Sequence, residues 1–336
     1  MKPSYRRWLK VGLGIVVSIA CLLFIFSRVN RGALLQALDS FSWPLLGAGI
    51  AALGFDYTLR IFRWKIILQS AGANASFGRC APAFLGSMAL NNLLPLRAGD
   101  IVRAMVFPVS LGISRATATA SLVLERLADL LALLACLGIG IALTQNHRIP
   151  EAQQYWITLF SAGSIAILIA TIVLAAPIAR ILTAVSIQQT RSNRPRFSLL
   201  ASKFSQLMAN LARMAQLRIL LAVGGLSLLI WFGEAGLFLA LLHGFGLPAT
   251  PQAALVIMAL ATLATLVPSS PGYVGPFHLA AFSAVILLGG NEGQAAGFAL
   301  LVHLTLWVTV TLAGVIGMVA YPVLFRRPTS NDVSNE

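Results

Sequence analysis

Long apolar segments recur along the whole chain, and they restrict its fold more than any other feature. A helix needs about 20 mostly apolar residues to cross the hydrocarbon core of a bilayer. The clear candidate spans are Leu9–Phe26, Pro44–Leu59, Leu127–Leu143, Tyr155–Ala176, Ile219–Leu242 and Ala295–Phe325. Only 10% of the 336 residues are charged, whereas roughly a quarter are charged in a typical soluble domain. The sequence therefore predicts an all-α, polytopic membrane helix bundle.

Three shorter apolar segments contain proline or glycine or lie next to a Pro/Gly-rich break. Gln252–Val267 and Gly275–Leu288 are expected to form short helices around a Pro/Gly-rich break, and Ala81–Pro95 is too short to cross. Broken backbone at membrane depth survives only where protein or water covers it, which favours a re-entrant hairpin at Ala81–Pro95. We expect about eight spans with one or two re-entrant Pro/Gly-broken hairpins. They form a single transmembrane domain over residues 1–327, followed by a disordered polar tail at 328–336.

Basic residues gather between the spans and give the chain a formal net charge of +14. In a membrane protein such residues indicate contact with anionic lipid headgroups, so no nucleic-acid partner is expected. The clusters lie at Lys2–Lys10, Arg60–Lys65, Arg180–Arg218 and Arg326–Arg327. Lysine and arginine are enriched in cytoplasmic loops, and eight crossings place all four clusters and both termini there. The sequence thus predicts a multi-pass protein of a bacterial-type inner membrane, with the segment Arg28–Asp39 as the exception.

A dense polar stretch begins within the segment Ala81–Pro95 and continues beyond it. Its candidate binding residues are Asn91, Asn92, Pro95, Arg97, Gly99, Asp100 and Arg103. Ionisable groups at bilayer depth usually face a protein interior or a wet cavity. On a helix beginning near Gly99, Asp100 and Arg103 share a face, and the helix N-terminus attracts anions. We expect Arg97 and Arg103 to receive a phosphate while Asp100 orients them. The alternative is an interfacial loop whose charges lie in water.

A second charged group opens the span that begins near Leu127. Glu125 and Asp129 lie four residues apart, a like-charge pair that destabilises an exposed helix, and Arg126 relieves only part of the repulsion. An outside cation, Arg97 or Arg103, is the expected partner. The alternative is a cluster at headgroup level that only sets the depth of the helix.

Two further acids lie inside apolar spans. Asp56 has Arg60 four residues on, followed by Arg63, Trp64 and Lys65, and we interpret this group as an interfacial anchor. Glu234 has no obvious partner in the sequence. It either completes a polar cavity or is protonated and hydrogen-bonded within the bundle.

The second Pro/Gly-rich break resembles the first. Leu94–Gly99 and Val267–Gly272 share an apolar residue, a proline, three residues and a glycine, and paired interrupted segments often mark the binding site of a transporter. The candidate residues here are Pro268, Ser269, Pro271, Gly272 and Gly275, which line a translocation path or form a tight turn. His303, on an apolar helix, is expected to be an interhelical hydrogen-bonding residue.

The sequence contains no catalytic constellation, such as GxSxG, HExxH or a Walker loop. Its three cysteines form no CxxC pair, so neither a metal nor a disulfide is indicated. No cofactor is expected.

At Asn92–Arg103, Leu124–Asp129 and Pro268–Gly275 the sequence resembles the lysylphosphatidylglycerol synthase transmembrane-region family, also called flippase-like integral membrane proteins. That family has Glu where this chain has Asp100, and Arg63 and Trp64 are similar to its Arg-Trp pair. The resemblance implies a helical bundle with two re-entrant hairpins. In some members this region moves aminoacylated phosphatidylglycerol between leaflets, and a separate soluble domain makes the lipid. That aminoacyltransferase domain is expected to be absent here.

The combined interpretation is a lipid translocase. It would bind an anionic phospholipid or a modified lipid in a polar intramembrane cavity and act beside a lipid-modifying enzyme. Two alternatives remain: a membrane-embedded aminoacyl- or glycosyl-transferase that acts on a lipid, and a lipid-binding scaffold without transport.

Overall fold

The structure, a computed structural model, describes residues 3–144 and 195–321, with isolated positions between 155 and 181. Side chains are described from residue 12 to 144 and from 204 to 321. The helices are α1 (Pro3–Arg28), α2 (Arg31–Asp39), α3 (Trp43–Ser70), α4 (Phe77–Leu93), α5 (Ala98–Met105), α6 (Pro108–Leu111), α7 (Arg115–Leu143), α9 (Pro195–Met214), α10 (Leu217–Gly244), α11 (Pro251–Ala264), α12 (Pro276–Leu287) and α13 (Glu292–Ala320). Two short 3-10 turns, η1 (Pro95–Arg97) and η2 (Pro271–Tyr273), interrupt the sequence of α-helices. No strand occurs in the described residues, which confirms the all-α prediction.

Four of the described helices, α3, α7, α10 and α13, are long and apolar enough to cross a bilayer. The pair of α1 and α2 adds a fifth if its 86° bend lies within one span. α11 and α12 are the two short helices expected around the second break. The expected span Tyr155–Ala176 and the tail 328–336 lie outside the described residues. The predicted helix bundle is therefore confirmed, while fewer than eight full spans are evident in the part that can be described.

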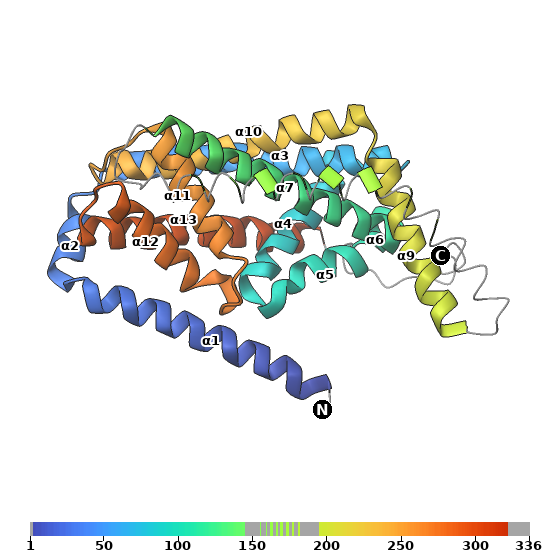
Figure 1. Ribbon diagram of the computed structural model, residues 1–336, viewed down its shortest axis with the longest axis horizontal. Coiled ribbons are helices and arrows are strands. Elements are labelled where there is room, and N and C mark those ends of the chain that lie inside the picture. Colours follow the sequence, from blue (N-terminus) through green and yellow to red (C-terminus); the bar gives the residue numbers. More distant parts are fainter. Residues whose placement is uncertain are drawn as a thin grey trace.

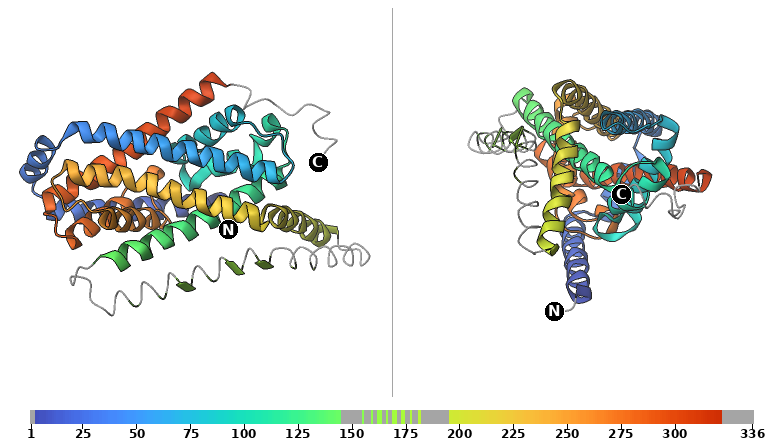
Figure 2. Two further views of the ribbon diagram at one scale, coloured as in Figure 1. Left: turned by 90° about the horizontal axis from the view of Figure 1, so that it is seen from above. Right: turned by 90° about the vertical axis from the view of Figure 1, so that its right-hand side faces the viewer.

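The long helices run along one axis of the molecule and pack side by side (Figure 1, Figure 2). The largest apolar core is built by α10, α11, α12 and α13, with contributions from α3 and α7. α1 lies along one side of this bundle and stands away from it at its N-terminal end in both figures. Most of the described α1 side chains are accordingly exposed, Leu13 and Val16 among them.

Small residues let α3 and α10 approach closely, as they do at many membrane helix interfaces. A Cβ atom added to Gly49 would lie 2.6 Å from Leu237 of α10, and one added to Gly233 would lie 3.4 Å from the Cβ of Asp56. This close packing brings the acidic residue of α3 beside the segment of α10 that carries Glu234. The helix pair thus positions two of the charges described below.

The two interrupted segments have the same local geometry. Each break begins with a proline after an extended residue, and the second and third residues of each 3-10 turn have positive φ angles. These angles are 61° and 52° at Leu96 and Arg97, and 74° and 60° at Gly272 and Tyr273. The predicted pairing of Pro95 with Pro268 is therefore wrong in register, because Pro271 occupies the equivalent position. A short helix follows each break.

Candidate functional site: a polar cavity beside a buried ionic cluster

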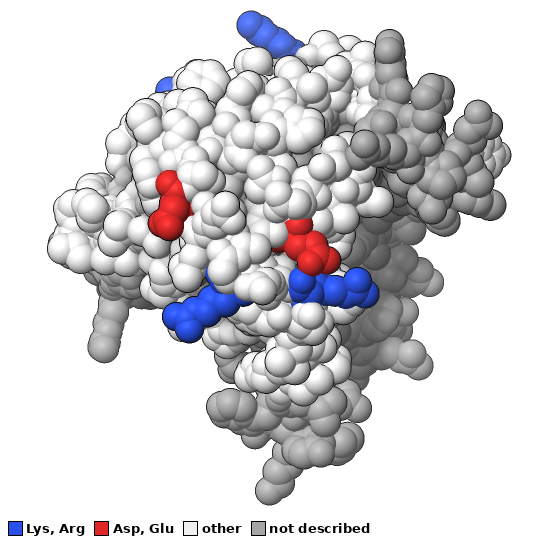
Figure 3. Space-filling model, turned by 90° about the vertical axis from the view of Figure 1, so that its left-hand side faces the viewer, with Lys and Arg blue, Asp and Glu red and all other residues white. Residues whose placement is uncertain are grey.

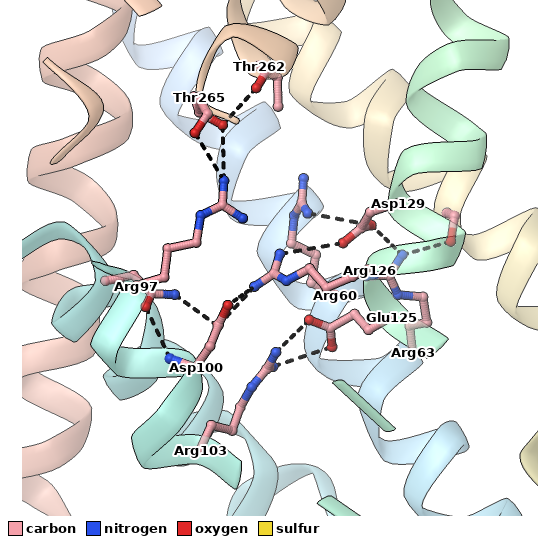
Figure 4. Close-up of polar contacts among 12 residues, drawn as sticks. Arg60, Arg63, Arg97, Asp100, Arg103, Glu125, Arg126, Asp129, Thr262 and Thr265 are labelled. Carbon is pink, nitrogen blue, oxygen red and sulfur yellow. Dashed lines mark hydrogen bonds and ion pairs between the residues drawn. The ribbon is translucent and has the colours of Figure 1, made fainter. Parts of the chain in front are cut away.

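A buried ionic cluster joins four helices in the interior of the bundle, and Figure 4 draws the part of it between α3, α5 and α7. Its members, which we call the ionic cluster, are Asp56, Arg60 and Arg63 of α3, Asp100 of α5, Arg126 and Asp129 of α7, and Glu234 of α10. The three α3 residues are spaced four and three apart, so they share one helix face. Figure 4 shows Arg60 and Arg63 of that face directed toward Asp129 of α7.

Arg60 is the centre of one half of the ionic cluster. Its Nε donates to the Asp56 carboxylate at 2.8 Å, and its Nη2 donates to Glu234 Oε2 at 2.7 Å. Its guanidinium also lies 4.6 Å from the ring centroid of Trp231, within the range of a cation–π contact. A buried charge is tolerated when it is paired in this way.

Asp129 links this half to the other. Its Oδ1 accepts from Arg63 Nη1 at 2.6 Å and lies 3.9 Å from Arg60 Nη1. Its Oδ2 lies 3.9 Å from Arg126, whose Nη2 donates to both carboxylate oxygens of Asp100 at 2.9 Å. Charged side chains of α3, α5, α7 and α10 thereby form one connected set.

These contacts correct the interpretation of the α3 residues. Asp56 and Arg63 are fully buried and Trp64 is 1% exposed, so this group is not an interfacial anchor. Glu234 is paired with Arg60 rather than without a partner. The four-residue spacing of Asp56, inside a predicted span, and Arg60, just after it, was the available signal, but the other partner of Arg60, Glu234, lies 174 residues away in the sequence.

The expected pairing of Asp100 with Arg103 does not form. Arg103 instead binds Glu125, at 2.6 Å and 3.3 Å, and its guanidinium lies over the rings of Trp64 and Phe84. The outside cation expected near Glu125 is therefore Arg103. This pair is almost fully buried and does not line the cavity described below, which removes Arg103 from the expected phosphate site.

Gly99 and Asn91 hold the start of α5 against α4. A Cβ atom on Gly99 would collide with the carbonyl oxygen of Ser87. Asn91 accepts from the backbone N–H of Asp100 at 3.1 Å and donates to its carboxylate at 2.9 Å. Because Asn91 occupies this backbone donor, the first turn of α5 is less open to an anion than the sequence suggested.

A cavity of about 420 Å³ lies beside the ionic cluster. Seven of the predicted site residues line this cavity: Asn91, Asn92, Arg97, Arg126, Asp129, Glu234 and Gly272. Further lining residues that the sequence did not single out include Tyr57, Trp231, Thr262, Thr265, Tyr273 and Trp307. The predicted residues Pro95, Gly99, Asp100, Arg103, Glu125, Pro268, Ser269, Pro271 and Gly275 do not line it.

Arg97 extends from the first break to Thr265 at the end of α11, as Figure 4 shows. Its Nη2 donates to the carbonyl and hydroxyl oxygens of Thr265, each at 3.3 Å, and its guanidinium lies 5.3 Å from the ring centroid of Tyr273. Among the described residues, no Asp or Glu side chain lies within salt-bridge distance of Arg97. It therefore lines the cavity as a cation without a carboxylate partner in the part of the chain that the structure describes.

Two further residues that line the cavity each have an N–H donor without an acceptor among the described residues. Nε of Arg126 and Nε1 of Trp231 are buried and have no hydrogen-bond partner in the described part of the chain. Buried polar groups are usually satisfied, so such donors indicate a place for an acceptor. Together with Arg97, they make the cavity suited to an anionic or oxygen-rich group. In the same part of the chain, no group of three or more His, Cys, Asp or Glu residues could hold a metal ion.

The fold and the cavity define a multi-pass membrane protein that has two interrupted segments meeting at an internal polar site. The family model described as the lysylphosphatidylglycerol synthase TM region matches residues 11–314. The chain belongs to this family, which confirms the resemblance carried by its motifs.

A similar curated protein is the glycosyltransferase AglD of Haloferax volcanii, which is 25% identical over 343 aligned residues. The match covers 94% of this chain and 55% of that protein. The chain thus spans about half the length of the curated relative. Family and relative together support a membrane protein related to lipid or glycan handling.

Proposed function

We propose that the protein binds an anionic lipid headgroup in the polar cavity and moves the lipid between the two leaflets of the membrane. The observation that carries the proposal is the environment of Arg97. This residue lines the cavity from the first break and has no carboxylate partner among the described residues. A phosphate would supply the missing countercharge, and arginine binds phosphate through paired, charge-assisted hydrogen bonds.

The remaining polar lining supports the same proposal. Arg126 and Trp231 each offer an N–H donor without a partner in the described residues. The carboxylates Asp129 and Glu234 are already bound to arginines, so their repulsion of an arriving phosphate is reduced. The cavity is also lined by apolar residues such as Leu133 and Phe277, which is typical of sites that orient a ligand with few polar groups.

The paired breaks favour transport over simple binding. In many transporters, discontinuous helices from two related halves meet at the substrate site near the middle of the membrane. Here the turns η1 and η2 contact each other, and Arg97 and Tyr273 extend from them to the cavity. The region where α5 and α12 begin lies near the middle of the molecule's length in Figure 1.

We further propose an inner-membrane location with both termini in the cytoplasm. Toward the right-hand end of Figure 1, α1 begins, α3 ends, and α7 and α10 begin. Lys65 lies near the end of α3, and Arg115 and Arg218 lie at the starts of α7 and α10. The opposite end, drawn in Figure 3, displays few charged side chains. An excess of lysine and arginine at one end favours the cytoplasmic side. A lipid-modifying enzyme in the same membrane would supply the cargo.

The proposal is tested by reconstituting the protein in vesicles that contain fluorescent phosphatidylglycerol in both leaflets. A membrane-impermeant reductant removes the fluorescence of the outer leaflet, and slow loss of the rest reports exchange. We expect exchange with the wild-type protein, loss of exchange with Arg97→Ala, and normal exchange with Arg218→Ala, which removes an exposed arginine at the start of α10. Equal exchange with Arg97→Ala and the wild type would contradict the proposal.

A transferase acting on a lipid at the same cavity is a second candidate. The name of the relative, a glycosyltransferase, favours it. However, the match covers only 55% of that protein, so its activity can lie in the part that this chain does not match. Mass spectrometry of the vesicle lipids separates the two functions. An unchanged lipid that exchanges between leaflets supports the translocase, whereas a lipid of altered mass supports the transferase. Lipid binding without exchange or change of mass would support the scaffold.

A further inference from the structure

A second, apolar cavity of about 550 Å³ lies between α1 and α13. We call it the apolar groove. Its walls include Leu22, Ile25 and Phe26 of α1 and Ala299, Leu300 and Leu304 of α13. Phe26, Leu300 and Leu304 are exposed, so the groove reaches the surface of the bundle. That surface faces lipid in a membrane protein.

The apolar groove and the polar cavity are separated by side chains that line both. These are Asn92, His303 and Trp307. Trp307 Nε1 donates to the carbonyl oxygen of Asn92 at 3.4 Å, and His303 Nε2 lies 2.7 Å from the carbonyl oxygen of Gly272. The dividing wall therefore joins the end of α4 to α13 and is hydrogen-bonded to the second break at Gly272.

α1 is attached to the bundle at the second break. Ser18 Oγ donates to the carbonyl oxygen of Val274 at 2.6 Å and accepts from the backbone N–H of Ser270 at 2.9 Å. A Cβ atom on Gly14 would lie 2.7 Å from the carbonyl oxygen of Ser269. This attachment holds α1 as the outer wall of the apolar groove.

We infer that the apolar groove holds a hydrocarbon chain of the same lipid whose headgroup meets Arg97. This inference rests on the proposed function. A lipid in transit must keep its chains in an apolar environment while its headgroup lies in a polar one. The apolar groove supplies the first environment and the polar cavity the second, and only Asn92, His303 and Trp307 stand between them. The ligand class is therefore an anionic lipid with a long flexible chain, rather than a water-soluble phosphate or sugar phosphate.

The test uses the whole protein in phosphatidylcholine vesicles that contain a small fraction of phosphatidylglycerol with a diazirine midway along one acyl chain. After irradiation, mass spectrometry locates the labelled peptides. We expect label on groove residues of α1 and α13, and a decrease of about tenfold at these positions in Arg97→Ala, as expected for the loss of a charge-assisted hydrogen bond. Label on Leu312 and Ile316, exposed residues of α13 outside the groove, reports surrounding lipid and should not change.

A second variant keeps the test independent of the headgroup site. Leu304→Trp fills the groove at an exposed position, so it should reduce groove labelling without unfolding the protein, whereas Leu312→Trp on the same helix should not reduce it. Absent groove labelling in the wild type, or equal labelling in Arg97→Ala, would overturn the inference. If Arg97-dependent leaflet exchange persists in that case, only the groove assignment fails. If exchange is independent of Arg97 as well, the proposed function fails with it.

Discussion

Arg97 and Tyr273 occupy equivalent positions in the two interrupted segments, and the guanidinium of one lies 5.3 Å from the ring centroid of the other. Each is the third residue of its 3-10 turn, and each has a left-handed backbone conformation. The repeated break therefore directs two side chains toward one another at the cavity. A cation and an aromatic ring in this arrangement attract each other, which keeps the guanidinium at the meeting point of the two segments.

The left-handed conformation of Leu96 leads to a prediction about stability. Its φ of 61° and ψ of 29° cost a non-glycine residue about 1 kcal/mol. We expect Leu96→Gly to raise the free energy of unfolding in micelles by about that amount. Leu94→Gly is the matched control, since Leu94 is similarly exposed but extended, with φ of −108°, and it should lower the free energy. Destabilisation by Leu96→Gly would contradict the assigned backbone conformation.

The pair of Arg103 and Glu125 should matter for folding and not for lipid binding. Removing one partner leaves a buried charge, so Arg103→Ala should destabilise the protein by about 3–5 kcal/mol. The double variant Arg103→Met, Glu125→Leu should recover most of the loss, because it removes both charges. Unfolding in micelles gives these values, and copurified lipid is measured in parallel. A double variant no more stable than Arg103→Ala would show that the pair does not act as a unit.

Gly99 should not tolerate a side chain. Gly99→Ala places a methyl group against the carbonyl oxygen of Ser87, so α5 must move away from α4. We expect the free energy of unfolding to fall by about 1–3 kcal/mol, the usual effect of overpacking. Lipid binding should also weaken. Gly78→Ala in α4 is the control, since nothing lies within 4 Å of its Cβ position. Equal stabilities of the two variants would argue against the tight contact.

The charge of Asp100 should limit the affinity of the cavity for an anion. Asp100→Asn removes the nearer carboxylate partner of Arg126 and leaves only Asp129, 3.9 Å away, so the cavity becomes more positive. We expect tighter binding of phosphatidylglycerol by a factor of about five, which corresponds to the roughly 1 kcal/mol of a partly exposed pair.

The controls for this change are Asp100→Glu, which keeps the charge, and Asp39→Asn, which removes an exposed charge at the end of α2. Both should bind as the wild type does. Unchanged or weaker binding by Asp100→Asn would indicate that Arg126 does not act on the bound headgroup.

The sequence predicted the helix bundle and the interrupted segment before Arg97, because apolar length and proline position are local properties. It also located Asp56 and Glu234 inside spans and Arg60 just after one, yet not the contact between Arg60 and Glu234. That contact depends on the close packing of α3 and α10, which hydropathy does not reveal. For the same reason, Asp56, Arg60 and Arg63 were interpreted as interfacial although they are buried.

Spacing along the sequence could not predict the ion-pair partners of Asp100 and Arg103. Three-residue spacing predicts that they bind each other, but the packing of α5 against α7 gives each a partner on α7 instead. The register of the repeat was missed because two prolines, Pro268 and Pro271, occur in the second break. Only the backbone angles distinguish which of them corresponds to Pro95.

The formal charges of the described interior side chains sum to zero. Among the described residues, five interior arginines, Arg60, Arg63, Arg97, Arg103 and Arg126, accompany five carboxylates, Asp56, Asp100, Glu125, Asp129 and Glu234. If the protein moves a lipid as proposed, the headgroup in this neutral environment carries all of the charge that crosses the membrane. The transmembrane voltage then acts on the cargo alone, with about 2.3 kcal/mol for each elementary charge per 100 mV. A monoanionic lipid would be driven outward by an inside-negative potential, and a zwitterionic one would not respond to it.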